Sequence, residues 1–174
     1  RQALALGVLA KEAGFPDGVM NIITGAASAI GKELTENPLV RKISFTGSTE
    51  VGKVLLQQSA TTVKKVSMEL GGHAPFVVFD DADLDEAITG AMQSKFRNSG
   101  QTCICANRIF VHEKVYDEFL NKFIDEVNKI KVGNGLEEGI VSGPLIDQSS
   151  LIKVHDQVKD AVNQGAKIAV GGDV

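Results

Sequence analysis

Apolar residues along this chain alternate between short runs bounded by turn residues and longer stretches with helical spacing. The short runs predict strands, and the longer stretches, with apolar residues three or four positions apart, predict helices. The predicted strands are 19–24, 42–45, 65–70, 76–79, 108–112 and 167–170. The predicted helices are 1–13, 28–36, 49–59, 84–97, 115–130 and 149–164. This strand–helix alternation indicates a parallel sheet covered by helices, so we expect an α/β fold.

Polar residues mark the expected ends of several helices. Ser28 stands where a helix N-cap is needed, and the Asn-Pro pair at 37–38 ends the same helix. The acidic cluster at 80–83 precedes another predicted helix, whose positive dipole end favours carboxylates. Capping therefore explains this cluster better than metal binding. The glycine pair at 71–72 marks the expected domain boundary, between 1–70 and 71–174.

The amino-acid composition argues against several classes of function. The 174 residues are 43% hydrophobic and 23% charged, which is typical of a globular protein. The net charge of −4, without a basic run, argues against a nucleic-acid partner. No apolar stretch approaches the roughly 18 residues of a membrane span. Two cysteines two positions apart do not form a secreted disulfide framework, so a reducing compartment is expected.

The segment Thr-Gly-Ser at 46–48 lies between a predicted strand and a predicted helix. Free amides at a helix start favour phosphate, and the Ser48 hydroxyl adds a donor while Gly47 admits a ligand close to the backbone. The spacing matches neither the Rossmann nor the Walker fingerprint, so on physical grounds alone simple helix capping is favoured over phosphate binding.

Cys103 and Glu69 are the candidate catalytic pair. Cys103 follows Gly100 in a predicted turn, where a ligand can reach a thiol. A thiolate attacks an aldehyde carbonyl to give a thiohemiacetal, and a carboxylate such as Glu69 activates water to hydrolyse the later thioester. Taken singly, a cysteine such as Cys103 is more often a small buried apolar residue than a nucleophile, and a strand-end glutamate such as Glu69 is usually just solvated.

Arg97 and Cys105 each allow two interpretations. Arg97 is either a cation at a helix C-terminus or a bidentate ligand for a substrate carboxylate. Cys105 is either a packed thiol or, if the backbone is extended, a partner on the same face as Cys103 for a strained disulfide. The two cysteines and His112 lack the fourth ligand and the spacing of a zinc site, so no metal is expected.

Several motifs in order resemble the NAD(P)-dependent aldehyde dehydrogenases, over essentially the whole chain. They are Glu-Leu-Gly-Gly at 69–72, Gly-Gln-Thr-Cys at 100–103 and Phe-Thr-Gly-Ser-Thr-Glu-Val-Gly at 45–52. The sequence Lys-Phe-Arg-Asn at 95–98 is similar to that of the succinate-semialdehyde dehydrogenases within this family. The resemblance implies a three-layer α/β fold, with part of a Rossmann-like coenzyme domain at 1–70 and part of an α/β catalytic domain at 71–174.

The same resemblance implies a role for each matching residue. Cys103 would be the nucleophile, Glu69 the general base, Arg97 the ligand of the substrate's distal carboxylate and Cys105 the partner in a redox-switch disulfide. The coenzyme, NAD or NADP, would be bound by Thr46, Gly47, Ser48, Val51 and Leu70. The substrate would be a small aldehyde, most simply succinate semialdehyde.

Family members are much longer, so we expect this chain to be an internal piece of a homo-oligomeric protein, a dimer or tetramer, of the cytoplasm or the mitochondrial matrix. Family segments that complete the oxyanion hole and the adenosine site are absent, so the isolated piece is expected to be inactive. Two alternatives stay open. One is an aldehyde dehydrogenase for another substrate class, and the other is a thiol redox or regulatory module that uses Cys103 and Cys105.

Overall fold

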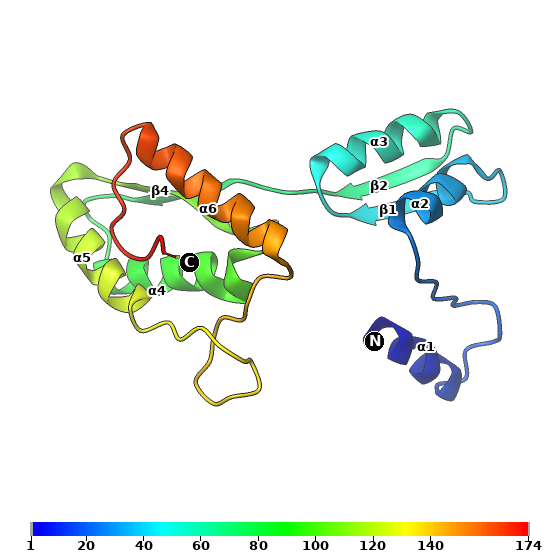
Figure 1. Cartoon of the computed structure of the whole chain (residues 1–174), viewed down its shortest axis with the longest axis horizontal. Helices are drawn as coiled ribbons and strands as arrows, with labels where there is room; N and C mark the ends of the chain where they lie inside the picture. The colour runs from blue at the N-terminus through cyan, green and yellow to red at the C-terminus, as the bar shows by residue number, and fades with distance from the viewer. Residues whose placement is uncertain (1, 174) are drawn as a thin grey trace. The chain divides into compact units, whose positions relative to one another are not determined.

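Two pairs of parallel strands organise the structure, a computed structural model that describes residues 2–173. The chain divides after Leu70 into two units, each with its own strand pair and flanking helices (Figure 1). The α/β class is therefore confirmed. The division falls where the glycine pair at 71–72 predicts one. The assignment of the two units to a coenzyme domain and a catalytic domain stays a prediction.

The first unit is built on one strand–helix–strand crossover. Its elements are α1 (Gln2–Glu12), α2 (Ala27–Glu36), β1 (Lys42–Thr46), α3 (Thr49–Ala60) and β2 (Lys65–Glu69). β1 and β2 pair in parallel, with Thr46 opposite Glu69. α3 connects the two strands and packs against both, and α2 packs on α3. This crossover brings the carboxyl ends of β1 and β2 together beside the start of α3.

The second unit has the same crossover with more helices after it. Its elements are β3 (Ala74–Val78), α4 (Leu84–Phe96), η1 (Arg97–Gly100), β4 (Ala106–Val111), η2 (Glu113–Val115), α5 (Tyr116–Val127) and α6 (Gln148–Asn163). β3 and β4 pair in parallel, and α4 packs against both β4 and α5. Val78, Ile88, Ala91 and Phe119 form the buried core of this unit.

The predictions of strands at 19–24 and 167–170 are wrong. A strand needs a neighbouring strand to satisfy its N–H and C=O groups, and among the described residues neither segment has one. The first segment makes local turn contacts instead: the N–H of Val19 donates to the Pro16 oxygen at 3.2 Å, and Asn21 Nδ2 donates to the Gly18 oxygen at 2.8 Å. Apolar content alone could not distinguish these segments from paired strands.

Most helix ends follow the predicted chemistry, with one exception. The Asp83 carboxylate accepts hydrogen bonds from the N–H groups of Asp85 and Glu86, so this member of the acidic cluster caps α4. Asn37 ends α2, as predicted. Ser28 does not cap that helix, because the helix begins at Ala27 and Ala26 takes the N-cap position. Among the described residues, no side chain makes a capping hydrogen bond at the start of α2.

Two further expectations concern metals and membranes. Within residues 2–173, no group of three or more His, Cys, Asp or Glu side chains is arranged to hold a metal ion. None of the described helices is both long and apolar enough to cross a bilayer. In the acidic cluster, Asp80 pairs with Lys114 at 2.7 Å, and this hydrogen bond lowers the pKa of the Asp80 carboxyl.

Candidate functional site

Cys103 is presented by a loop that begins with an unusual turn. α4 ends at Phe96, and Arg97 leaves helical geometry with φ −53° and ψ 131°. The next residues, Asn98, Ser99 and Gly100, all have positive φ, at 53°, 56° and 73°. Three consecutive left-handed residues reverse the chain sharply, and such conformations are concentrated at functional sites. The loop that follows leaves Cys103 exposed.

Gly72 is in direct contact with this loop. A Cβ atom at Gly72 would collide with the main-chain oxygen of Cys103, so only glycine lets the two backbones approach this closely. Asn107 Nδ2 also donates to the Gly72 oxygen, at 3.4 Å. The last residue of the Glu-Leu-Gly-Gly motif therefore helps to position the Cys103 loop.

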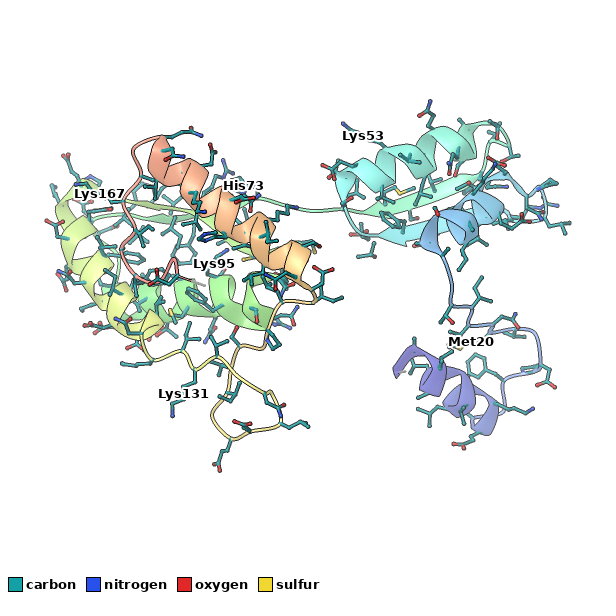
Figure 2. The ribbon with its side chains drawn as sticks, in the orientation of Figure 1. Met20, Lys53, His73, Lys95, Lys131 and Lys167 are labelled. Atoms are coloured by element: carbon teal, nitrogen blue, oxygen red, sulfur yellow. The ribbon has the colours of Figure 1, made fainter. Side chains whose placement is uncertain are left out.

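Cys105 differs from Cys103 in burial. Its side chain is buried, with the Sγ donating to the Lys95 oxygen at 3.4 Å and 3.6 Å from Lys95 Nζ. Figure 2 labels Lys95 on α4, and its Nζ also donates to Asn107 Oδ1 at 2.8 Å. Both cysteines are free thiols.

The geometric argument for a disulfide between Cys103 and Cys105 is wrong. It required extended backbone, in which positions two apart share a face. The chain turns here instead, with the N–H of Cys105 donating to the Thr102 oxygen at 3.3 Å. One sulfur is consequently exposed and the other buried. The redox switch that the family resemblance implies stays a prediction, and it would require this turn to open.

Arg97 and Cys103 line the same depression, of about 1270 Å³. Its other lining residues include apolar Ile104, Ile130 and Val141. Arg97 is exposed, and among the described residues its guanidinium has no hydrogen-bond or ion-pair partner. An arginine without a protein partner, facing the same space as an exposed thiol, fits a bidentate ligand for an acid group.

The residues expected to bind coenzyme gather at the carboxyl end of the β1–β2 pair. The N–H of Gly47 donates to the Glu69 oxygen at 3.1 Å, which joins Thr46-Gly47 to the end of β2. The Ser48 hydroxyl caps α3 by accepting from the N–H of Val51 at 3.3 Å, and its own hydrogen stays available. Gly47 and Ser48 are both exposed. Capping and phosphate binding are therefore compatible.

Val51, Leu70 and Glu69 complete this part of the site. Val51 is 46% exposed on the first turn of α3. The Leu70 side chain packs so closely on Gly52 that a Cβ there would lie 2.6 Å from Leu70 Cδ2. Glu69 is the last residue of β2, and its side chain is exposed. Among the described residues its carboxylate has no hydrogen-bond or ion-pair partner.

Sequence reasoning missed four residues that build the Cys103 loop. They are Lys95, Ser99, Asn107 and Ser142. Ser99 Oγ lies 2.8 Å from Ser142 Oγ, across 43 positions of sequence. Lys95 stands within the family-like segment 95–98 and Asn107 lies two positions after Cys105, so they could have been considered together, because both flank the cysteines. The sequence carries no local signal for the serine pair.

Comparison with known proteins gives one consistent result. The profile described as "Aldehyde dehydrogenase family" matches residues 2–174. The chain is 57% identical over 170 residues to an Escherichia coli protein named succinate-semialdehyde dehydrogenase [NADP(+)], covering 98% of this chain and 35% of that protein. Pseudomonas putida proteins named glutarate-semialdehyde dehydrogenase and 3-sulfolactaldehyde dehydrogenase are 58% and 56% identical, with the same coverage. The chain thus spans about a third of the length of these relatives.

Solved structures agree with the sequence relatives. One, described as an Escherichia coli NADP-dependent enzyme, superposes with a TM-score of 0.96 at 56% identity, covering 99% of this chain and 36% of that one. A succinate-semialdehyde dehydrogenase from Burkholderia pseudomallei superposes equally well, with a TM-score of 0.96 at 56% identity over 98% of this chain and 36% of its own.

Proposed function

The chain belongs to the aldehyde dehydrogenase family, and we propose that the full-length protein oxidises an aldehyde to its carboxylate with NAD(P)+. Residues 1–70 would be part of the coenzyme domain and 71–174 part of the catalytic domain. The observation that carries the proposal is the shared depression lined by Cys103 and Arg97. It supplies a nucleophile and an acid-binding group within one space.

The proposed substrate is succinate semialdehyde. The names of three similar proteins denote aldehydes that also carry an acid group, either a carboxylate or a sulfonate. Arg97 would bind that group through two parallel N–H donors, which holds the aldehyde end at a fixed distance. The apolar wall formed by Ile104, Ile130 and Val141 suits the methylene carbons between the two ends.

The exposed start of α3 fits the pyrophosphate of the coenzyme. Gly47 has no side chain to cover its exposed backbone, and the Ser48 hydroxyl, which accepts from the N–H of Val51, can still donate its own hydrogen. Both residues lie beside the positive end of the α3 dipole. Thr46 and Leu70 would contact the nicotinamide side, and Val51 the adenine. NAD(P)+, when bound, supplies the hydride acceptor that turns the thiohemiacetal into a thioester.

The chain's own residues would perform the covalent steps. The Cys103 thiolate forms a bond to the aldehyde carbon, and the carbonyl electron pair moves to oxygen. The main-chain N–H of Cys103, which has no acceptor among the described residues, is available to stabilise that oxygen. Glu69 then takes a proton from water, whose oxygen attacks the thioester carbon. The carbon–sulfur bond breaks, releasing the carboxylate product and the thiolate.

Turnover of the full-length protein tests the proposal, with formation of reduced coenzyme followed separately for NAD+ and NADP+. Cys103→Ala should lower kcat by at least about 1000-fold. Arg97→Ala should lower kcat/KM by roughly 10- to 100-fold for succinate semialdehyde, because one charge-assisted bidentate contact is lost, and change it little for butanal. Arg108→Ala is the matched control, because Arg108 is exposed but lies over the Phe110 ring, outside the depression.

Retained activity in Cys103→Ala would remove the nucleophile assignment. Equal losses for both aldehydes in Arg97→Ala would remove the acid-binding role and leave an aldehyde dehydrogenase of another substrate class. Homo-oligomer formation and the compartment, cytoplasm or mitochondrial matrix, stay predictions. Light scattering of the full-length protein checks the first of these.

A further inference from the structure

The left-handed turn after Arg97 requires contacts that hold it. Asn98 and Ser99 are not glycine, so their positive φ values are unfavourable and persist only when neighbouring groups stabilise them. Asn98 is held locally, because its oxygen accepts from the N–H of Gln101 at 3.1 Å and its Nδ2 donates to the Gln101 oxygen at 3.2 Å. These contacts lie within the turn itself.

Ser99 is held from a distance. Its Oγ lies 2.8 Å from Ser142 Oγ, and both side chains are partly buried. Ser142 is itself fixed through its backbone: its oxygen accepts from the N–H of Gly133 at 3.0 Å, and its N–H donates to the Lys131 oxygen at 3.3 Å. Ser142 also lines the depression that contains Arg97 and Cys103. The segment after α5 is thereby tied to the turn that orients Arg97.

We propose that Ser142 is a positioning residue for substrate recognition: its hydroxyl holds Ser99, and the Ser99–Ser142 pair fixes the backbone that carries Arg97 beside Cys103. The inference rests on the proposed function and deepens it. Without the pair, the turn relaxes and the Arg97 guanidinium samples more orientations. The chain then loses its selectivity for an aldehyde with an acid group, while the chemistry at Cys103 continues.

The first experiment measures KM and kcat of the full-length protein for succinate semialdehyde and for butanal. Ser99→Ala and Ser142→Ala should each raise KM for succinate semialdehyde by roughly 3- to 10-fold, the equivalent of one neutral hydrogen bond. The double variant should lose no more than either single variant, because both changes remove the same contact. kcat/KM for butanal should fall by a smaller factor than kcat/KM for succinate semialdehyde, and Ser142→Thr, which keeps a hydroxyl, should retain the parent values. Ser149→Ala is the control, since that hydroxyl bonds Asp147 outside the depression.

The second experiment does not depend on turnover. Iodoacetate and iodoacetamide both alkylate a thiolate with loss of iodide, but only iodoacetate carries a negative charge that Arg97 attracts. Mass spectrometry of the Cys103 peptide gives the two rates. The iodoacetate-to-iodoacetamide ratio should fall in Arg97→Ala, and by a smaller factor in Ser99→Ala and Ser142→Ala. Ser99→Gly removes the hydroxyl but makes the left-handed backbone favourable, so it should keep more of the parent ratio than Ser99→Ala does.

Four results would overturn the inference. Three of them are additive losses in the double variant, equal losses for both aldehydes, and an alkylation ratio that Ser99→Ala and Ser142→Ala leave unchanged. An effect of Ser142→Ala without one of Ser99→Ala would also overturn it, because Ser142 would then act without its partner. If the parent protein does not oxidise succinate semialdehyde, the proposed function fails, and the alkylation ratio still decides the role of the serine pair.

Discussion

The two units have the same strand–helix–strand plan but are stabilised in different ways. In the second unit, Val78, Ile88, Ala91 and Phe119 form one apolar cluster, and Phe119 stacks on Phe123 with ring centres 5.6 Å apart. Among the described residues of the first unit, Ile43 is the one apolar side chain that is buried, at 9% exposure.

Buried polar groups take a larger part in the first unit. Thr35 and Ser59 are its two most buried side chains, at 0% and 2% exposure. Thr35 Oγ1 lies 3.0 Å from Gln58 Oε1, which joins α2 to α3. Lys64 Nζ donates to the oxygens of Asn37 and Val40, at 2.6 and 2.8 Å.

This difference predicts which of the two units is the less stable in the isolated chain. A net hydrogen bond contributes about 1 kcal/mol, whereas burial of one large apolar side chain contributes about 1.5–3 kcal/mol. We therefore expect the second unit, which presents Cys103 and Arg97, to be the more stable. The first unit, which holds the proposed coenzyme segment, leaves Leu39 and Val63 86% and 89% exposed. Peptide-level hydrogen exchange of the chain should show faster exchange in the first unit.

The largest effect is expected from a substitution that removes part of the core of the second unit. Phe119→Ala should destabilise that unit by about 3–5 kcal/mol, because it leaves a cavity among Val78, Ile88 and Ala91. Exchange in residues 71–173 should then approach the rate of the first unit. Phe110→Ala is the matched control, since that ring is 52% exposed and its loss should cost far less. If both variants exchange alike, the core does not explain the difference between the units.

The next effect concerns the backbone contact at Cys103. Gly72→Ala should cost about 1–3 kcal/mol, because the new Cβ collides with the Cys103 oxygen and the loop must move. Gly71→Ala is an unusually close control: nothing lies within 4 Å of its added Cβ. Urea unfolding gives the stabilities, and the rate of Cys103 alkylation reports the loop. Matching results for the two glycines would contradict the assigned contact.

These contacts also show what sequence could and could not predict. The strands β1 to β4 and all six α-helices follow from periodicity and turn residues, because each is reinforced by local pattern. Residues 19–24 have the same apolar character but lack a neighbouring strand, and pairing is not encoded locally. α1 forms as predicted, yet its Leu4, Val8 and Leu9 side chains are exposed, so periodicity did not predict burial.

The candidate site was likewise predictable from the sequence only in part. Motifs identified Cys103, Glu69 and Arg97 as candidates, and the structure places Arg97 and Cys103 in one depression. The opposite environments of Cys103 and Cys105 depend on a turn whose left-handed residues include Asn98 and Ser99. A turn at Gly100 was predicted, but the positive φ values of Asn98 and Ser99 were not, because neither residue type requires that conformation.

A smaller effect separates the two buried hydroxyl groups of the first unit. Thr35→Val should cost about 1–2 kcal/mol, because it removes the hydroxyl that bonds the Gly31 oxygen at 2.8 Å and Gln58. Ser59→Ala should be neutral or stabilise by up to about 1 kcal/mol, because the Ser59 Oγ is buried without a hydrogen-bond partner in the described structure. Urea unfolding of the two variants measures both changes. A loss in Ser59→Ala as large as that in Thr35→Val would mean that buried hydroxyls in this unit stabilise regardless of their contacts.

The smallest effect concerns helix capping, which also differs between the units. α2 in the first unit has no side-chain cap, whereas the Asp147 carboxylate caps α6 in the second by accepting from the N–H of Ser150 at 2.8 Å. Hydrogen bonds from Ser150 and then Ser149 lower the pKa of Asp147 below its usual 3.8. Because the pKa of Asp147 is lower in the folded state, its stabilisation of α6 is present above pH 3.8 and is lost as pH falls through the folded-state pKa.

Asp147→Asn still caps the helix but has no carboxyl group to titrate. It should therefore remove this pH dependence of α6 while leaving that of α2 unchanged. Hydrogen exchange of the α6 peptide below pH 4, compared between the parent chain and Asp147→Asn, measures it. An identical pH response in the two proteins would show that the charge of Asp147 does not contribute to the stability of α6.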